Sequence, residues 1–189
     1  MMTFVEDLVL SLDVDPAATQ IACVTFANDA IVRFFLNKYS DSLDIVGELM
    51  AMRRQSGGTN TAQALQITRE KVLDLLNGAR YGVLQVVIVI TDGKSGDTPA
   101  TLEQAIFLRN RGVAVFSIGV GTNLDIEELK GIAGDEHVER VYSVDSFDNL
   151  VSINDQLIKA TCDGEVLAFL DHNKRYFLTV RRVKRLFSP

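Results

Sequence analysis

The sequence predicts an α/β fold in which a doubly wound, mostly parallel sheet carries helices on both faces. Three observations lead to this expectation: continuous apolar runs, amphipathic runs at helical spacing between them, and turn residues at the junctions. Alternation of strands and helices is typical of a parallel sheet, and fully apolar strands fit a sheet covered on both faces. The 189 residues, 47% of them hydrophobic, suffice for one domain with a sizeable core.

The N-terminal part of the chain is predicted to form a helix, a hairpin and a second helix. The first segment places its apolar residues on one helical face, and acidic residues interrupt it, which is unlike a secretory signal. The turn-like pair Asn28-Asp29 separates two strand-like runs, as in a hairpin. In order, the expected elements are a helix within 1–13, strands at 20–26 and 31–35, and a helix within 41–52.

The remaining part alternates between helices and buried strands. A long helix is expected to stop at Asn77-Gly78, and the next helix to begin at Pro99 and end before Gly112. The inward side of the long helix is expected to consist of Ala64, Leu65, Val72, Leu75 and Leu76. The expected elements are a helix at 61–77, a central strand at 83–90, a helix at 99–111, a strand at 113–120, a helix at 125–133, a strand at 140–144, and a helix at 146–160 capped by Ser146.

Several classes of function are disfavoured by the sequence. Ile88 stands where a phosphate-binding loop ending in Gly93-Lys94-Ser95 would need its first glycine, and Leu124 stands where a dinucleotide motif would need its third. The two histidines have no serine or cysteine near them in sequence, so nothing indicates nucleophilic catalysis. A net charge of −6 is unfavourable for nucleic-acid binding, and no apolar run of about 18 residues suggests a membrane span.

Two oxygen-bearing side chains are expected at one edge of the sheet. Asp92 ends the most apolar strand, and Thr59 lies in the loop GGTNT before a helix. Taken alone, Asp92 is better explained by a turn with Gly93, and the loop by helix capping. Ligands of such sheets bind at the carboxyl ends of the strands, where both loops can meet. A hydroxyl and a carboxylate together are a partial shell for a hard cation such as Mg²⁺.

Five motifs, in the right order, resemble the von Willebrand factor type A domain: GGTNT, VVIVITDGKSGD, GVAVFSIGVG, DIEELKGIA and VYSVDSFDNL. The resemblance covers roughly residues 3–162 and is greatest to extracellular-matrix members such as matrilins and type VI collagen chains. It implies a Rossmann-like sheet with a metal-ion-dependent adhesion site for Mg²⁺ or Mn²⁺. In that site an Asp-x-Ser-x-Ser loop supplies three ligands, and the metal accepts a carboxylate from a protein partner. Thr59 and Asp92 match the family's remaining Thr and Asp.

The chain departs from the family pattern at the first strand. The match begins inside the first helix, so the central strand and its Asp-x-Ser-x-Ser loop are missing before Phe4. We therefore expect a type A domain at 1–162 that lacks its first strand, followed at 163–189 by a basic tail or by the start of a second repeat. One hypothesis is that residues 166–170 insert as the central strand, in the same molecule or by domain swapping with a neighbour.

That hypothesis brings Asp171 to the metal site as a third ligand and makes the segment from Phe177 the start of a helix. A disordered basic tail is the equal alternative. Arg175 stands where the family has a hydroxyl, and a cation opposes metal binding, so we expect affinity for Mg²⁺ or Mn²⁺ to be weak or absent. Cys162 matches a family position that often pairs with a cysteine before the first strand, which this chain lacks, and Cys23 is expected in the core.

The expected function is that of a non-enzymatic protein-binding module of a secreted, extracellular adhesion protein. The resemblance implies a protein ligand, with collagen or another matrix protein as the candidate. Two alternatives stay open. The first is an intracellular type A scaffold in a protein complex, which an unpaired Cys162 and the lack of a signal peptide favour. The second is a metal-assisted phosphotransfer enzyme that would use Asp97 and Lys94 beside Asp92.

Overall fold

The computed structural model describes residues 2–53, 56–145 and 175–182, and all structural statements below concern these residues. The helices are α1 (Met2–Ser11), α2 (Ser42–Ala51), α3 (Thr61–Ile67), α4 (Thr98–Asn110) and α5 (Ile126–Ala133). The strands are β1 (Gln20–Phe26), β2 (Ala30–Phe34), β3 (Leu84–Thr91), β4 (Ala114–Val120), β5 (Val141–Val144) and β6 (Arg175–Arg182). Short turns of other helix types lie at Thr68–Val72, Leu75–Asn77 and Val138–Arg140.

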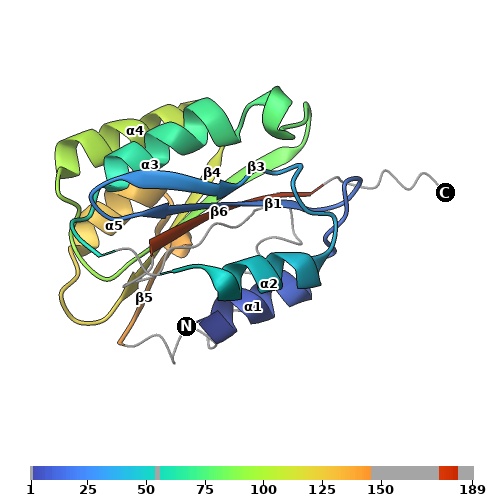
Figure 1. Ribbon diagram of the computed structural model, residues 1–189. Helices are drawn as coiled ribbons and strands as arrows, with labels where there is room; N and C mark the ends of the chain where they lie inside the picture. Colours follow the sequence, from blue (N-terminus) through green and yellow to red (C-terminus); the bar gives the residue numbers. More distant parts are fainter. Residues whose placement is uncertain (1, 54–55, 146–174, 183–189) are drawn as a thin grey trace.

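A six-stranded sheet in the order β2-β1-β6-β3-β4-β5 forms the middle layer of the molecule. Helices α1 and α2 lie together on one face, and α3 and α4 lie on the other (Figure 1). Helix α5 continues the second layer, because it packs against α4 and β4. The predicted α/β fold with helices on both faces is therefore confirmed. No helix of the described residues is long and apolar enough to cross a membrane.

Most strands of the sheet run in one direction. Strands β3, β4 and β5 form parallel ladders, and β1 has their direction because it and β3 are both antiparallel to β6. Strand β2 folds back on β1, which confirms the predicted hairpin. The carboxyl ends of β1, β3, β4 and β5 therefore meet at one edge of the sheet, which we call the carboxyl edge. This edge is where α/β sheets bind ligands.

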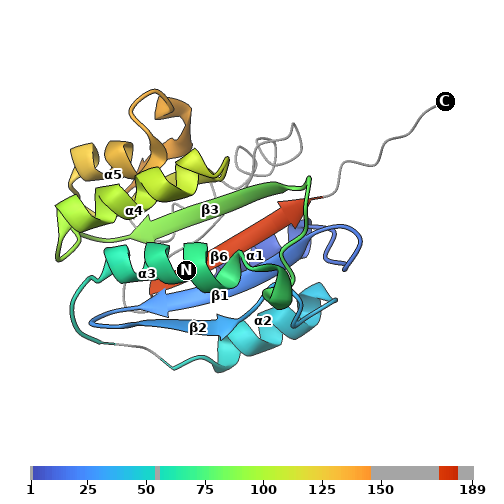
Figure 2. The same ribbon diagram turned by 90° about the horizontal axis from the view of Figure 1, so that it is seen from above.

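The central place of the sheet is filled from the C-terminal end of the chain, but not by the expected segment. Strand β6 lies between β1 and β3 with its direction reversed (Figure 2). Residues 166–170 and Asp171 lie outside the described residues, and the prediction that 166–170 form this strand is wrong because Arg175–Arg182 occupies the place. The prediction of a helix from Phe177 is wrong for the same reason. Aromatic and β-branched residues favour a strand here, and pairing satisfies the backbone groups of both neighbours.

The core is built on the strands. Every residue of β1 and β4 is buried, and β3 is buried from Val86 onward. Cys23 is fully buried in β1, where desolvation raises the pKa of its thiol well above the usual value. Its expected place in the core is confirmed. The predicted helix at 146–160 and Cys162 lie outside the described residues.

The long helix predicted at 61–77 changes type along its length. Helix α3 is followed by a π-helical turn at Thr68–Val72, in which the N–H of Leu73 donates to the carbonyl of Thr68 at 2.9 Å. The helix ends after this π turn, because Asp74 is extended with a φ of −95° and a ψ of 145° and Leu75–Asn77 forms a separate 3-10 turn. Ala64, Leu65 and Val72 are buried as predicted. The prediction is wrong for Leu75 and Leu76, which are 49% and 88% exposed. The predicted stop holds, because Gly78 adopts a φ of 95°.

Candidate functional site

The loop GGTNT is held against the turn between β1 and β2. The N–H of Gly58 donates to Oδ1 of Asn28 at 2.6 Å, and the N–H of Asn60 donates to the carbonyl of Ala27 at 2.8 Å. Nδ2 of Asn60 also donates to the carbonyl of Asn28 at 3.1 Å. Gly57 has a φ of 133°, and a Cβ at this position would lie 2.7 Å from Oδ1 of Asn28, so the backbone approach requires glycine. These contacts fix the loop at the carboxyl edge of β1.

Asn60 provides the helix cap that the sequence of this loop predicts. Its Oδ1 accepts a hydrogen bond from the N–H of Gln63 at 3.1 Å and so begins α3. Oε1 of Gln63 in turn accepts from the N–H of Ala30 at 2.7 Å, which ties the start of the helix to β2. Thr59 precedes the cap and is half-buried. The capping is therefore done by Asn60, and the threonine hydroxyl is not needed for it.

The loop that carries Asp92 follows β3 and ends at α4. Asp92 is half-buried, directly after Thr91, whose hydroxyl donates to the carbonyl of Gly93 at 2.9 Å and closes the turn. At the other end of the loop, Oδ1 of Asp97 accepts from the N–H of Ala100 at 3.0 Å and caps α4. Asp97, one of the candidate acids of the phosphotransfer alternative, is therefore the N-cap of a helix.

One backbone hydrogen bond joins the two predicted site loops. The N–H of Gly96 donates to the carbonyl of Thr59 at 2.8 Å. The loops of Thr59 and Asp92 therefore lie side by side at the carboxyl edge. That their side-chain oxygens share one ion stays a prediction, as does the part assigned to Asp171, which lies outside the described residues.

Helix α5 holds the loop of Asp92 from the other side through two side chains. Nζ of Lys94 lies 2.8 Å from Oδ2 of Asp125, the N-cap of α5, and this hydrogen bond lowers the pKa of Asp125 and raises that of Lys94. The N–H of Ser95 donates to Oε2 of Glu128 at 2.9 Å, and the hydroxyl of Ser95 donates to Oε1. Lys94 is exposed and Asp125 is half-buried, whereas Ser95 and Glu128 are 8% and 4% exposed.

Three residues of this edge were not predicted from the sequence as site residues: Asn28, Ser95 and Glu128. Asn28 is recognisable in sequence only as part of a turn. Glu128 leaves a clearer signal, because it lies one helical turn before Ile132 on the buried side of α5. An acid on the apolar side of an amphipathic helix indicates a specific buried partner.

The described residues do not form a complete site for Mg²⁺ or Mn²⁺. They contain no group of three or more His, Cys, Asp and Glu that could hold a metal ion. If Thr59 and Asp92 both act as ligands, as the sequence predicts, they supply two of the six ligands that an octahedral ion takes. Because β6 is reversed, its first residue, Arg175, pairs with Phe26 at the carboxyl edge, which brings a cationic residue type to this edge.

The comparisons with known proteins agree with this architecture. The sequence model of the von Willebrand factor type A domain matches residues 1–156. The collagen alpha-5(VI) chain of Mus musculus is 36% identical over 166 residues, which are 87% of this chain and 6% of that protein. Matrilin-2 of Mus musculus is 28% identical over 177 residues, which are 92% of this chain and 18% of that protein. The chain thus spans only a small part of both relatives.

A solved structure gives the corresponding similarity in three dimensions. Proximal thread matrix protein 1 from the mussel byssus, with a zinc-occupied MIDAS (metal-ion-dependent adhesion site) motif, aligns with a TM-score of 0.77 and 31% sequence identity. The alignment covers 96% of this chain and 41% of that one. The zinc site is a property of that protein. The described residues of this chain contain no group of three or more His, Cys, Asp and Glu that could hold such an ion.

Proposed function

This chain belongs to the von Willebrand factor type A domain family, and from that premise we propose that it is a protein-binding module that uses its carboxyl edge to hold a matrix protein. Its relatives in the collagen VI and matrilin families are extracellular-matrix proteins, which supports an extracellular adhesion role. The observation that carries the proposal is the hydrogen bond between Gly96 and Thr59, because it joins two loops into one surface.

The proposed surface is made of polar groups held on a rigid backbone. Thr59 and Asp92 are half-buried, and Lys94 is exposed beside them. The loop GGTNT is bonded to the β1–β2 turn, and the loop of Asp92 is bonded to α5. The two loops are also bonded to each other through Gly96 and Thr59. Preorganised polar loops bind a partner without first losing conformational entropy. A collagen or another matrix protein is the partner class that the relatives suggest.

The binding of Mg²⁺ or Mn²⁺ is proposed to be weak or absent in this chain. Two side-chain oxygens and a basic strand end at the carboxyl edge are a poor environment for a divalent cation. The proposed adhesion role therefore rests on the loops themselves, and removal of divalent cations is expected to leave partner binding unchanged.

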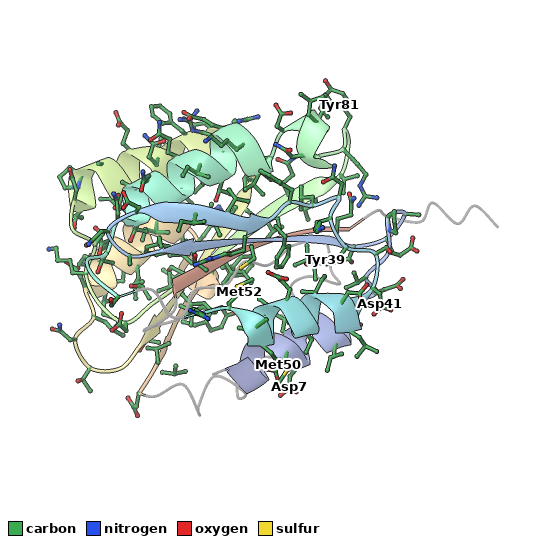
Figure 3. All side chains as sticks on the ribbon, in the orientation of Figure 1. Asp7, Tyr39, Asp41, Met50, Met52 and Tyr81 are labelled. Carbon is green, nitrogen blue, oxygen red and sulfur yellow. The ribbon has the colours of Figure 1, made fainter. Side chains whose placement is uncertain are left out.

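The proposal is tested by solid-phase binding of the full chain to immobilised fibrillar collagen and, separately, to a collagen-free matrix fraction. We expect Thr59→Ala and Asp92→Ala to weaken binding about tenfold or more, since polar contacts at an interface centre carry most of the affinity. Tyr81→Ala is the matched control. Tyr81 is 86% exposed and precedes β3, so it lies at the opposite end of the sheet (Figure 3).

Equal binding of the two carboxyl-edge variants and the wild-type chain would place the interface elsewhere and contradict the proposal. Loss of binding in the Tyr81 variant alone would do the same. A parallel assay in EDTA tests the expected independence from divalent cations.

The phosphotransfer alternative finds no support in the arrangement of its candidate residues. Asp97 caps α4, and Lys94 pairs with Asp125 at 2.8 Å, so both are engaged in holding the loop. The relatives described above are structural matrix proteins, which is consistent with a non-enzymatic role. Saturable hydrolysis of p-nitrophenyl phosphate that is lost in Asp92→Ala would contradict this assignment.

A further inference from the structure

We propose that Glu128 of α5 is a positioning residue for the carboxyl edge, and that it acts through Ser95 to set where Asp92 lies relative to Thr59. The inference deepens the proposed function and rests on it for its biological meaning. The positioning itself is a property of the free chain and can be tested without a partner.

The contact between Glu128 and Ser95 is buried and uses both carboxylate oxygens. Oε2 accepts the backbone N–H of Ser95 at 2.9 Å, and Oε1 accepts its hydroxyl. The hydroxyl also lies 3.4 Å from Oγ1 of Thr98, in the first turn of α4. A single acid therefore fixes both the backbone and the side chain of one loop residue, which restricts the loop more than a contact to a side chain alone.

Burial of this acid is not explained by ion pairing. The salt bridges of the described part of the chain do not include Glu128; Lys94 forms its salt bridge with Asp125 and interacts with Glu128 only through the longer-range attraction of their charges. A buried carboxylate that accepts hydrogen bonds from the neutral groups of Ser95 loses solvation that a well-packed apolar residue would not lose. Stability alone would favour an apolar residue here, so we infer that the geometry of the contact is what Glu128 provides.

The contact is transmitted to Thr59 by the next residue. Gly96 follows Ser95 and donates its N–H to the carbonyl of Thr59 at 2.8 Å. Adjacent residues of one loop are thus bonded to α5 on one side and to GGTNT on the other. Any shift of Ser95 away from Glu128 changes the position of Gly96 and hence the separation of the two site loops.

Helix α5 is a firm support for this arrangement. The carbonyl of Leu129 accepts the hydroxyl of Ser117 in β4 at 2.7 Å, and Nη1 of Arg109 in α4 donates to the carbonyl of Gly131 at 2.8 Å. A Cβ on Gly131 would lie 2.6 Å from Cδ2 of Leu102, so α4 and α5 are in close contact. The loop of Asp92 is therefore held in position by α5, which is itself bonded to β4 and α4.

The test measures the hydrogen exchange of the Gly96 amide by NMR in the free, full-length chain. In Glu128→Ala we expect the exchange rate of the Gly96 amide to rise about tenfold or more relative to the amides of β3 and β4. Without the contact between Ser95 and Glu128, local opening of the loop costs less free energy. Glu128→Gln should restore most of the protection, since its amide oxygen can accept the N–H of Ser95. Glu127→Gln is the matched control, because that neighbouring side chain is 81% exposed.

Protection of Gly96 that is unchanged in a folded Glu128→Ala chain would overturn the proposal. So would a Glu128→Gln chain that exchanges as fast as Glu128→Ala, because the effect would then follow from the loss of charge. If Glu128→Ala does not fold, Ser95→Ala takes its place: it keeps the backbone N–H, so an intermediate rise at Gly96 is expected, and no rise would count against the proposal.

Binding to immobilised fibrillar collagen separates this inference from the proposed function. If both stand, Glu128→Ala weakens binding and Glu127→Gln does not. If Gly96 responds as expected but no form of the chain binds collagen or the matrix fraction, the proposed function fails while the positioning role of Glu128 stands.

Discussion

At the scale of single residues, the carboxyl edge depends on a few positions where the backbone conformation restricts which residue type can stand there. Gly57 is the clearest, since its φ of 133° and its approach to Asn28 both exclude a side chain. Asn28 in turn binds the backbone of Gly58 and is bound by the side chain of Asn60. The backbone of the loop that presents Thr59 is therefore held in part by glycine and asparagine.

Substitution of Gly57 tests how much strain the loop tolerates. We expect Gly57→Ala to lower the free energy of unfolding by about 1–3 kcal/mol, because alanine is forced into a sparsely populated backbone region. Gly47→Ala in α2 is the matched control: a Cβ there meets nothing within 4 Å, so the higher helix propensity of alanine should stabilise the chain by up to about 1 kcal/mol. Urea unfolding of both variants checks the opposite signs. Equal destabilisation would show that the backbone conformation at Gly57 is not restrictive.

The ion pair of Lys94 and Asp125 predicts a pH dependence with a definite sign. The pKa of Asp125 is lowered by its hydrogen bond from Lys94, so the pair stabilises the fold above the ordinary Asp pKa of about 4, and this stabilisation is lost as the pH falls from that value through the lowered pKa of Asp125. The difference in urea midpoint between wild type and Lys94→Ala should therefore be present at pH 7 and smaller at pH 3. Because Lys94 is exposed, added salt should also reduce the difference at pH 7. A difference that is the same at both pH values contradicts this assignment.

At the scale of elements, most strands and helices could be predicted from the sequence because their apolar patterns are long. Strands β1, β3 and β4 are continuous apolar runs, and α4 is marked by Pro99 and Gly112 at its ends. The π turn after α3 could not be predicted, because the spacing of Val72, Leu75 and Leu76 fits a regular helix equally well. Periodicity assumes that one regular helix continues, and it fails here because the π turn is followed by the extended residue Asp74.

This change of helix type can be tested with two aliphatic residues. Val72→Ala removes a fully buried side chain and should lower the free energy of unfolding by about 2 kcal/mol. Leu76→Ala removes a larger side chain that is 88% exposed, and should change stability by less than about 0.5 kcal/mol. Thermal or urea unfolding of the two variants is the measurement. A larger effect at Leu76 would mean that the regular helix predicted from the sequence is the correct one.

At the scale of the whole molecule, the candidate site could be predicted only in part. Sequence motifs were enough to place Thr59 and Asp92 on neighbouring loops, because both loops follow from the order of strands and helices. Glu128 and Asn28 could not be assigned to the site, because their contacts join residues 33 and 30 positions apart, Glu128 to Ser95 and Asn28 to Gly58. Reversal of the central strand was likewise inaccessible, because an apolar pattern does not specify strand direction.

The reversed central strand bears on the metal chemistry of the molecule. Strand β6 brings Arg175 to the carboxyl edge, where it pairs with Phe26. We expect isothermal titration with Mg²⁺ or Mn²⁺ to give no saturation at micromolar metal, since a basic residue type at this edge disfavours a divalent cation. Asp92→Asn is the control, because it should change the titration with Mg²⁺ or Mn²⁺ only if the metal binds at Asp92. Clear saturation that is lost in Asp92→Asn would show that a metal binds at this edge and would contradict the expectation.

The final prediction concerns what holds the two halves of the sheet together. Strand β6 pairs with β1 over Gln20–Phe26 and with β3 over Leu84–Val89, and no other strand of the described residues joins these halves. Leu178 lies in the middle of both ladders, opposite Cys23 and Ile88. Leu178→Pro removes a backbone donor there and should cost about 3 kcal/mol or more, a large share of the stability of a typical domain. Ser42→Pro is the control, because it places proline at the first position of α2, where proline is tolerated, and should leave the urea midpoint nearly unchanged. If the two proline variants unfold alike, β6 does not supply the central strand, and the sheet must be completed by another segment or by a second copy of the chain.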